Sequence, residues 1–545
     1  MDRPGTGAVR HGVRLGTPKR RRIGVPDSDI YADPAFYDAE TKTARRAVQE
    51  LSIQLDLRIP EIQKWQRYYD GHQPLKFATD EYRKHFGEQY AGFNDNWCAP
   101  VADTTAEKLT VAGLRLAEDS QEADSAVQRL ADRDFARIWQ ANECPAQSSQ
   151  AFTEACIAKR SFVTVWGRGD DERTPEITFD SPDEVIVGYE PGSRRRRKTA
   201  LKRWTDGKYD YATLHIRDMA TGVARVWKWQ RERPDGSPES YTPDAIRKFQ
   251  WVIRDVPSGS PVVLDNPSGV IPIIELANRP RLKDEPLSEV AGAAAMQDAI
   301  NSLWSYLFTA ADFRALPQRV VLGAVTPQIP VLDAEGKPTG AFRPVPMAEA
   351  LNRASVARIM GFEGPDARID QWDAADLAVF TGAIEFGVGH LAAQSRTPAH
   401  YFTGKIVNVP EGALVALAQA HISKVRERAL YHSGSIKEIA AVEYLMLGEK
   451  AKAAAARGGR VMWEDFEIRP EGQMADLAIK LKQAGFSFPY IAERFISDPV
   501  ELAEEIGRHN TEQAQQAALM DFGPKPAIEP GAPDDSQDVP ADGAG

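Results

Sequence analysis

The sequence predicts an α+β fold in which helical segments flank a region rich in strands. Between about residues 162 and 263, β-branched and aromatic residues recur in short runs that Gly and Asp turns separate. On either side of that region, apolar residues recur at helical spacing. A buried strand predicted over 270–276 stops at an Asn-Arg-Pro turn, and the long helix after it ends at Leu316-Pro317.

Bulk composition indicates a large soluble protein. A chain of 545 residues corresponds to about three or four domains, and 42% hydrophobic and 27% charged residues are ordinary for a globular protein. The net charge of −11 argues against a protein that binds nucleic acid over its whole surface. No cofactor is predicted, and no apolar run is long enough to predict a membrane span.

Cysteine usage and the two ends of the chain add further expectations. Cys98, Cys144 and Cys156 lack C-x-x-C spacing and predict a reducing compartment without disulfides. The arginine-rich N-terminus has no apolar segment of the kind a signal peptide needs. Residues 1–40 and 521–545 are rich in Gly, Pro and charged residues and are predicted to be disordered.

Helices are predicted on both sides of the strand-rich region. The first begins near Thr41, Pro60 opens a second one, and Gly71 closes that second helix. Further along the chain, Asp373 is predicted as a helix N-cap and Gly434 as a kink. The other predicted helices span residues 97–109, 125–141, 146–160, 289–315, 373–393, 411–447, 471–484, 489–495 and 499–507.

Strands are predicted from alternating or β-branched runs. Turn residues between them predict hairpins and therefore an antiparallel sheet. A Pro- and Gly-rich region at 317–371 is predicted to mix short strands with a short helix. The predicted strands lie at residues 162–167, 177–179, 185–187, 202–204, 212–216, 223–230 and 461–468.

No catalytic pattern stands out. The chain has no H-E-x-x-H, no P-loop and no G-x-S-x-G, so no catalytic or metal site is predicted. The acidic trio at 170–172 lies between two predicted strands and is typical of a hairpin tip rather than a metal site. His421 lies on the apolar side of its helix and is interpreted as a packing histidine, and Gly387-x-Gly389 is interpreted as a fragment of a Gly-rich pattern without a function.

The densest basic cluster is the run from Arg194 to Lys198. Such a run could contact phosphates or a partner protein. The preceding Pro191-Gly192-Ser193 favours the alternative of a solvated hairpin loop.

Six short motifs occur in order between roughly residues 50 and 510. They are W-Q-R-Y-Y-D-G-H-Q-P-L at 65–75, N-W-C-x-x-V-x-D at 96–103, I-W-x-x-N at 138–142, the segment 269–281, Q-D-A-I-N at 297–301 and P-Q-R at 317–319. This order resembles that of tailed-bacteriophage portal proteins of the siphophage and actinophage type. Each motif is weak alone, but their shared order makes chance an unsatisfactory explanation. Ala102 departs from the family pattern, in which a second Val is common at that position.

The resemblance implies a domain layout with an α/β wing, a two-helix stem, a small α/β clip and a helical crown. The implied segments are an N-terminal arm at 1–40, the wing at 41–288, a first stem helix at 289–316, the clip at 317–372, a second stem helix at 373–394, a tunnel loop at 395–410, a kinked wing helix with a returning strand at 411–470, the crown at 471–520 and a tail at 521–545.

The resemblance also implies a function and partners. It implies a dodecameric ring at one capsid vertex, which would be the channel for packaging and ejection of double-stranded DNA. The implied partners are the terminase large subunit, a head–tail connector or adaptor, and the major capsid and scaffolding proteins. The protein would be made in the host bacterial cytoplasm and would reside in the virion without contacting a membrane. ATP hydrolysis would belong to the terminase, which fits the missing P-loop.

Two sets of residues follow from this layout. Arg396, His400 and Lys405 of the tunnel loop are candidates for transient contacts with DNA phosphates, or they simply solvate the loop. A second set is predicted to pack the stem, with its small members allowing close helix approach. It comprises Gly292, Ala294, Ile300, Trp304, Phe380 and Ile384.

Two other classes of protein stay open at this point. Another structural virion protein, such as a minor capsid or adaptor protein, would not need two long helices that flank a Pro- and Gly-rich insert. A hydrolase would need paired carboxylates that the sequence does not reveal. The portal interpretation is favoured over both.

Overall fold

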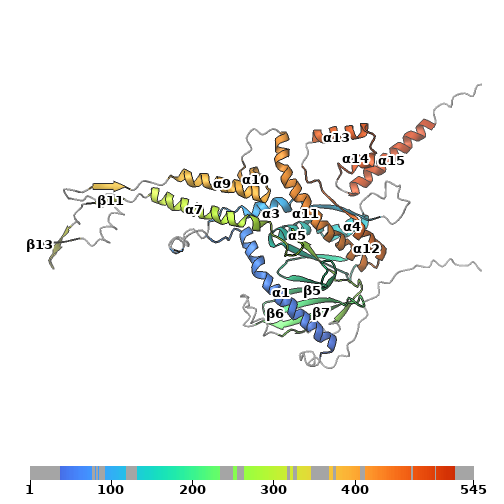
Figure 1. The fold of residues 1–545 in the computed structure, drawn as a ribbon, viewed down its shortest axis with the longest axis horizontal. Helices are drawn as coiled ribbons and strands as arrows, with labels where there is room; N and C mark the ends of the chain where they lie inside the picture. The colour runs from blue at the N-terminus through green and yellow to red at the C-terminus, as the bar shows by residue number, and fades with distance from the viewer. Residues whose placement is uncertain are drawn as a thin grey trace, which may run out of the picture. The chain divides into compact units, whose positions relative to one another are not determined.

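The computed structural model, shown in Figure 1, describes most of the chain. The chain forms two compact units. The first unit is built from residues 1–109, 146–166 and 176–435, and the second from 110–145, 167–175 and 436–545. The described residues are 37–75, 80, 84, 93–117, 132–233, 250–254, 263–315, 319–322, 328–344, 368–371, 376–404, 411–467, 471–496 and 499–521.

Helix α1 (Ala39–Tyr69) opens the first unit. It runs unbroken through Pro60, so the predicted division there is wrong. The reason is packing, because side chains on both sides of the proline, Leu55 and Ile62 among them, are buried. The helix stops where predicted, at Gly71, whose φ of +83° suits the left-handed end of a helix.

An antiparallel six-stranded sheet lies against α1, as Figure 1 shows. Apolar residues of α1 such as Leu51 pack with Leu201, Trp227 and Trp229 of the sheet in one hydrophobic core. The predicted antiparallel sheet is confirmed, although strands β8 and β9 were not predicted. The strands are β4 (Val185–Tyr189), β5 (Arg197–Thr205), β6 (Tyr209–Arg217), β7 (Ala224–Glu232) and β8 (Val252–Ile253), and β9 (Val263–Asn266) pairs with β7.

A second antiparallel sheet of three strands has the order β10-β2-β3. Val163 pairs with Ile274 on one side and with Phe179 on the other. This register ends β10 immediately before Asn278, the first residue of the Asn-Arg-Pro turn. The three strands of this sheet are β2 (Arg160–Trp166), β3 (Glu176–Asp180) and β10 (Ile273–Ala277). Helices α3 (Cys98–Ala106) and α5 (Cys144–Ala158) precede β2 in the chain.

The long helices of the first unit follow β10. The helix predicted from residue 289 begins instead as a short 3-10 turn, η5, before α7 starts at Ala294. The N-cap of α9 is Asp376, whose Oδ1 accepts from the Ala378 amide at 3.0 Å, while the predicted cap Asp373 lies outside the described residues. Helix α11 is continuous through Gly434, and the predicted kink there stays a prediction. The elements are η5 (Val290–Gly292), α7 (Ala294–Ala315), α9 (Leu377–Ser395), α10 (Ala399–Thr403) and α11 (Glu411–Met446).

Two antiparallel strand pairs lie in the chain between α7 and α9. Strand β11 (Arg319–Leu322) pairs with β14 (Arg368–Gln371). Strand β12 (Gln328–Leu332) pairs with β13 (Pro338–Pro344) across a turn that the Asp333 carboxylate stabilises by accepting from the Lys337 amide at 2.7 Å.

In the second unit, β1 (Val111–Arg115) pairs antiparallel with β15 (Arg460–Trp463). The strand predicted to reach residue 468 ends at Trp463, because β1 offers no further residues to pair with. Helix α4 starts at Arg133, and residues 125–131 of the predicted helix lie outside the described residues. The last helix continues to Asp521, past the predicted end at 507. The other helices are α4 (Arg133–Ala141), α12 (Lys450–Gly458), α13 (Glu471–Gln483), α14 (Phe488–Ala492) and α15 (Pro499–Asp521).

Candidate functional site at the root of the paired helices

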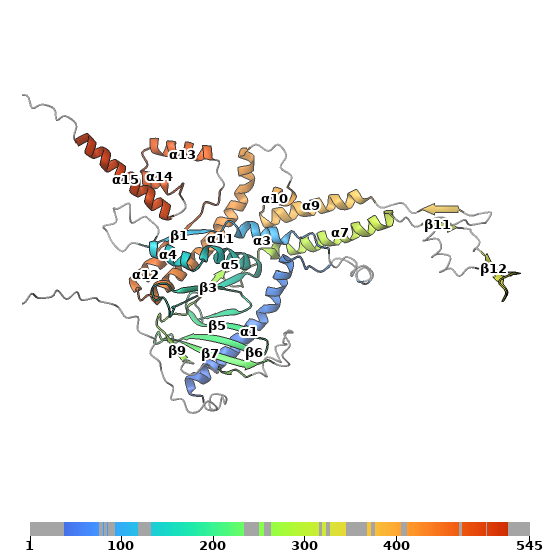
Figure 2. The ribbon, with the colours of Figure 1, turned by 180° about the vertical axis from the view of Figure 1, so that it is seen from behind.

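Helices α7 and α9 lie side by side over much of their length, as Figures 1 and 2 both show. We call them the paired helices. At Gly387 the two backbones approach so closely that an added Cβ would lie 3.2 Å from Cγ1 of Ile300. That contact is tighter than most real Cβ contacts, so glycine is the residue that fits. Gly387 was interpreted from sequence as part of a Gly-rich pattern without a function, although its helical spacing from buried Ile384 and Leu391 was a usable signal.

The residues predicted to pack the stem are distributed unevenly. Ala294, Ile300 and Ile384 are buried, and Trp304 and Phe380 are half-buried. Gly292 is exposed in the 3-10 turn, with nothing within 4 Å of an added Cβ. Within the chain, therefore, Gly387 rather than Gly292 is the glycine at which the paired helices approach closely.

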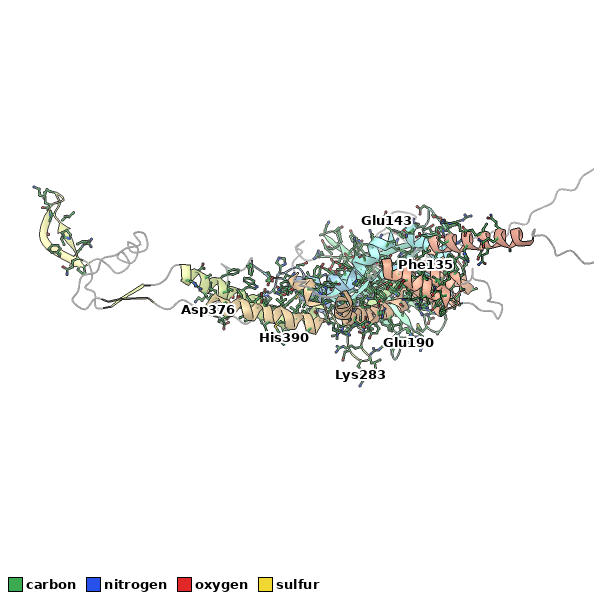
Figure 3. The ribbon with its side chains drawn as sticks, turned by 90° about the horizontal axis from the view of Figure 1, so that it is seen from above. Phe135, Glu143, Glu190, Lys283, Asp376 and His390 are labelled. Atoms are coloured by element: carbon green, nitrogen blue, oxygen red, sulfur yellow. The ribbon has the colours of Figure 1, made fainter. Side chains whose placement is uncertain are left out.

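One face of α9 is apolar and uncovered. The helix carries no Lys or Arg between residues 377 and 395. Its buried face includes Val388 and Leu391. On the uncovered face, the side chain of Val379 is 66% exposed and that of Phe386 is 71% exposed. The ring of Phe386 packs only 4.4 Å from that of His390, which Figure 3 labels on α9. A helix that is apolar all round is typical of a fully buried element, so this face lacks a cover within the described chain.

The N-terminal end of α7, which we call its root, is held in place by a network of polar side chains. Gln297 accepts a hydrogen bond from the Trp97 amide at 2.7 Å and donates one to the Asp95 carbonyl at 2.5 Å. It also donates to Asn301, and Asn301 donates to Gln73 at 2.9 Å. Since buried polar groups are costly when unpaired, this network specifies one arrangement of three distant segments.

Aromatic side chains extend the same network. The indole N–H groups of Trp97 and Trp304 donate to one carboxylate oxygen of Asp95, at 2.9 and 2.8 Å. The Tyr68 hydroxyl donates to the buried carboxylate of Asp298 at 2.8 Å. The motifs at 65–75, 96–103 and 297–301, which are distant in the sequence, therefore meet at one place. The motifs are visible in the sequence, but the hydrogen bonds between them are not predictable from it.

A buried ion cluster lies directly before the paired helices. Glu289 accepts from Arg428 at 2.6 Å and from Asn278 at 3.2 Å, and the Lys424 ammonium is 3.2 Å from its second oxygen. The side chains of Glu289, Lys424 and Arg428 are 1–3% exposed. Desolvation opposes the charge on Glu289, but Lys424 and then Arg428 outweigh it and lower its pKa to about 2.

Of the predicted tunnel-loop residues, Arg396 is connected to this cluster by ion pairs. Arg396 ends α9 in the left-handed conformation, with φ of 54°, and its guanidinium is 3.3 Å from Glu427. The same Glu427 oxygen is 2.8 Å from Arg428, so an ion chain links the end of α9 to buried Glu289. His400 is half-buried in α10, and Lys405 lies outside the described residues.

Two smaller predictions can be checked. His421 places its Nε2 2.9 Å from the Thr104 carbonyl oxygen, and its burial lowers its pKa, as suits a packing histidine. The acidic trio at 170–172 lies in the link between β2 and β3, where Asp171 accepts from the Arg173 amide. In the described part of the chain, no group of three metal-ligating side chains is placed to hold an ion.

Comparison with known proteins identifies the family. Residues 50–517 match the family described as "Phage portal protein, SPP1 Gp6-like". The chain belongs to this family. The assignment supports the predicted α+β portal fold, makes the protein a virion component, and favours a structural role over a hydrolase.

Portal proteins of two mycobacteriophages are similar to this portal-family chain. The portal protein of Mycobacterium phage L5 is 26% identical over 391 residues, which is 70% of each chain. The portal protein of Mycobacterium phage D29 is 26% identical over 394 residues, again 70% of each. A solved chain from "Virion of native gene transfer agent (GTA) particle" aligns over 78% of this chain and 90% of its own, with 12% identity and a TM-score of 0.37. No helix among the described residues is long and apolar enough to cross a membrane.

Proposed function

We propose that the chain forms a dodecameric ring at one capsid vertex, and that the ring is the channel for packaging and ejection of double-stranded DNA. The observation that carries this proposal is the uncovered apolar face of α9, where Val379 and Phe386 are largely exposed. A contiguous apolar face of this kind marks an interaction site. A second copy of the chain is its occupant, because head-to-tail contacts between identical subunits close into rings.

The charge of the paired helices supports a channel that lets DNA slide. Between them, α7 and α9 carry three carboxylates, Asp298, Asp312 and Glu385, against the single cation Arg314. Because DNA binding strengthens with each cation that neutralises a phosphate, a surface this poor in cations binds the duplex weakly. Transient phosphate contacts beside this surface come from the tunnel loop at 395–410, through Arg396, His400 and Lys405.

The remaining segments take the roles that the family layout implies. Residues 41–288 and 411–470 form the wing, 289–316 and 373–394 the stem, and 471–520 the crown. The clip at 317–372 docks the terminase large subunit during packaging and a head–tail connector or adaptor afterwards. In support, the hairpin β12–β13 leaves Leu332 55% and Phe342 63% exposed, and an isolated two-stranded hairpin is at best marginally stable. Capsid and scaffolding proteins surround the ring.

The proposal is tested by purifying the chain and measuring its mass by light scattering alongside negative-stain electron microscopy. We expect end-on rings with a central hole and the mass of a dodecamer of the 60.2 kDa chain. A monomer or dimer that never forms rings, even at high concentration, would contradict it.

A further inference from the structure

Two basic loops of the first unit lie next to each other. The first, at 190–198, contains the arginine run that the sequence analysis left open, and the second, at 279–285, follows the Asn-Arg-Pro turn. The guanidinium of Arg194 donates to the backbone carbonyl of Arg281, so the loops meet although 87 residues separate these two positions. Together the loops hold eight cations and three carboxylates, in a chain whose net charge is −11.

Both loops have a defined backbone. In the first loop, the Ser193 hydroxyl accepts from the Arg196 amide at 3.0 Å after a turn at Gly192, whose φ is +80°. In the second loop, Asn278 closes the base by donating to the Leu287 carbonyl at 2.9 Å. The cations are therefore presented from fixed positions, which lowers the entropy lost when a ligand binds.

The three carboxylates of the loops already have partners. Glu190 is 2.8 Å from Arg196, and Asp284 is 3.2 Å from Arg281. The third, Glu285, pairs with Arg160, a buried neighbour that also binds Glu275. No carboxylate of the loops is left to neutralise the other cations.

Three exposed cations of the loops make neither an ion pair nor a side-chain hydrogen bond within the described residues. They are Arg195 and Lys198 of the first loop and Lys283 of the second, and all three are exposed. Figure 3 labels Glu190 and Lys283, and the Lys283 side chain extends away from the ribbon. Arg194 adds a fourth charge, because its bond to a carbonyl leaves that charge uncompensated.

We propose that these two loops together bind the phosphate backbone of duplex DNA without sequence preference, at a surface made by neither the paired helices nor the tunnel loop. The inference rests on the proposed function, which makes duplex DNA the polyanion nearest to this protein. A guanidinium group can donate two parallel hydrogen bonds to the oxygens of one phosphate. Six of the eight cations in the loops are arginines, at 194–197, 279 and 281. The competing ligand is an acidic protein segment, which would use the 92% exposed side chain of Leu282 as an apolar anchor.

The experiment measures binding of a short fluorescent duplex of mixed sequence to the purified full chain over a series of salt concentrations. The test variant combines Arg195→Glu, Lys198→Glu and Lys283→Glu, none of which removes an ion pair among the described residues. We expect at least a tenfold loss of affinity at low salt. The slope of log affinity against log salt should become shallower by about 3, since each lost phosphate contact removes about 0.9.

A matched control makes the same change in charge elsewhere on the first unit. It combines Lys42→Glu, Arg46→Glu and Lys337→Glu, three exposed cations on α1 and in the β12–β13 turn. This variant should bind DNA nearly as the wild type does. Equal affinities of the test and control variants would overturn the proposal, because net charge alone would then explain the binding.

Leu282→Ser separates the two ligand classes. It should leave DNA binding unchanged, because the contacts are to phosphates. Tighter binding of a glutamate-rich peptide that also contains leucines than of DNA, weakened by Leu282→Ser, would overturn the proposal in favour of an acidic protein partner. Ring formation by every variant is scored separately by electron microscopy. Absence of rings in the wild type would count against the proposed function, whereas loss of DNA binding in intact rings bears only on this surface.

Discussion

Gly387 of α9 faces Ile300 of α7 so closely that one methyl group at position 387 would press on the isoleucine side chain at 3.2 Å. The pairing of the two helices therefore depends on a glycine in the middle of a helix, where glycine costs about 1 kcal/mol relative to alanine. That cost is offset by the close approach of two apolar helix faces.

Replacing Gly387 with Ala should separate these two effects. Gly389→Ala is the matched control, because nothing lies within 4 Å of a Cβ at that position and the change should stabilise the helix by up to about 1 kcal/mol. Gly387→Ala should be less stable than Gly389→Ala by about 1–3 kcal/mol, the usual range for overpacking. Urea unfolding of both variants checks this, and equal stabilities would contradict the close approach.

The ion cluster around Glu289 predicts a strong asymmetry between variants. Glu289→Gln leaves Lys424 and Arg428 buried without their counter-charge and should destabilise the first unit by about 3–5 kcal/mol. Adding Lys424→Met and Arg428→Met to it should recover much of that loss. Denaturant unfolding of the single and triple variants measures the difference, and a triple variant no more stable than the single one would argue against charge burial as the cause.

The carboxylate of Glu289 also predicts that acid lowers the stability of the fold. The folded pKa of Glu289, about 2, lies below its ordinary value, so the stability it contributes is present above the ordinary pKa and is lost as pH falls towards 2. Acid titration followed by circular dichroism should show this loss in the wild type and not in Glu289→Gln.

Glu443 of α11, in the second unit, predicts the opposite dependence on pH. Burial, with a smaller contribution from Asp132, raises its pKa to about 8, and neither carboxyl oxygen has a hydrogen-bond partner among the described residues. Its contribution to stability is therefore full below the ordinary pKa and is lost as pH rises through 8. Thermal unfolding between pH 6 and 9 should show a falling midpoint that Glu443→Gln flattens. Glu438→Gln, on the same helix at a residue paired with Arg457, should keep the wild-type slope.

The uncovered face of α9 predicts how assembly can be blocked. Val379→Glu with Phe386→Glu adds charge to this face without touching the buried side chains of α9, so monomers should fold but fail to form rings. Gln394→Glu, also exposed on α9, is the control and should assemble normally. Light scattering and microscopy give the readout, and rings formed by the double variant would place the subunit interface elsewhere.

The tunnel-loop proposal can be tested apart from assembly. Arg396→Ala with Lys405→Ala should leave rings intact and slow DNA packaging, because two cations next to the channel are lost. Glu427→Gln breaks the same ion chain without removing a cation, so it separates a phosphate contact from a structural role. Unchanged packaging by the double alanine variant would remove the proposed DNA contacts.

Much of the architecture follows from local patterns in the sequence. Period-2 runs predicted the antiparallel sheet, helical spacing predicted the two paired helices, and Gly71 marked the end of α1. Local signals were less reliable where packing decides. Pro60 lies inside a continuous helix, and β15 stops at Trp463 because its partner strand ends. Neither outcome can be predicted from the neighbouring residues in the sequence.

The sequence by itself determined the order of elements, the poverty of cations in the paired helices and the family to which the chain belongs, because these depend on local periodicity, composition and short motifs. Tertiary structure alone decided that Gly387 meets Ile300, that Gln297 joins Gln73 through Asn301, and that Arg194 lies beside Arg281. These contacts join residues far apart in the chain, and only burial and hydrogen-bond geometry in the folded state select them.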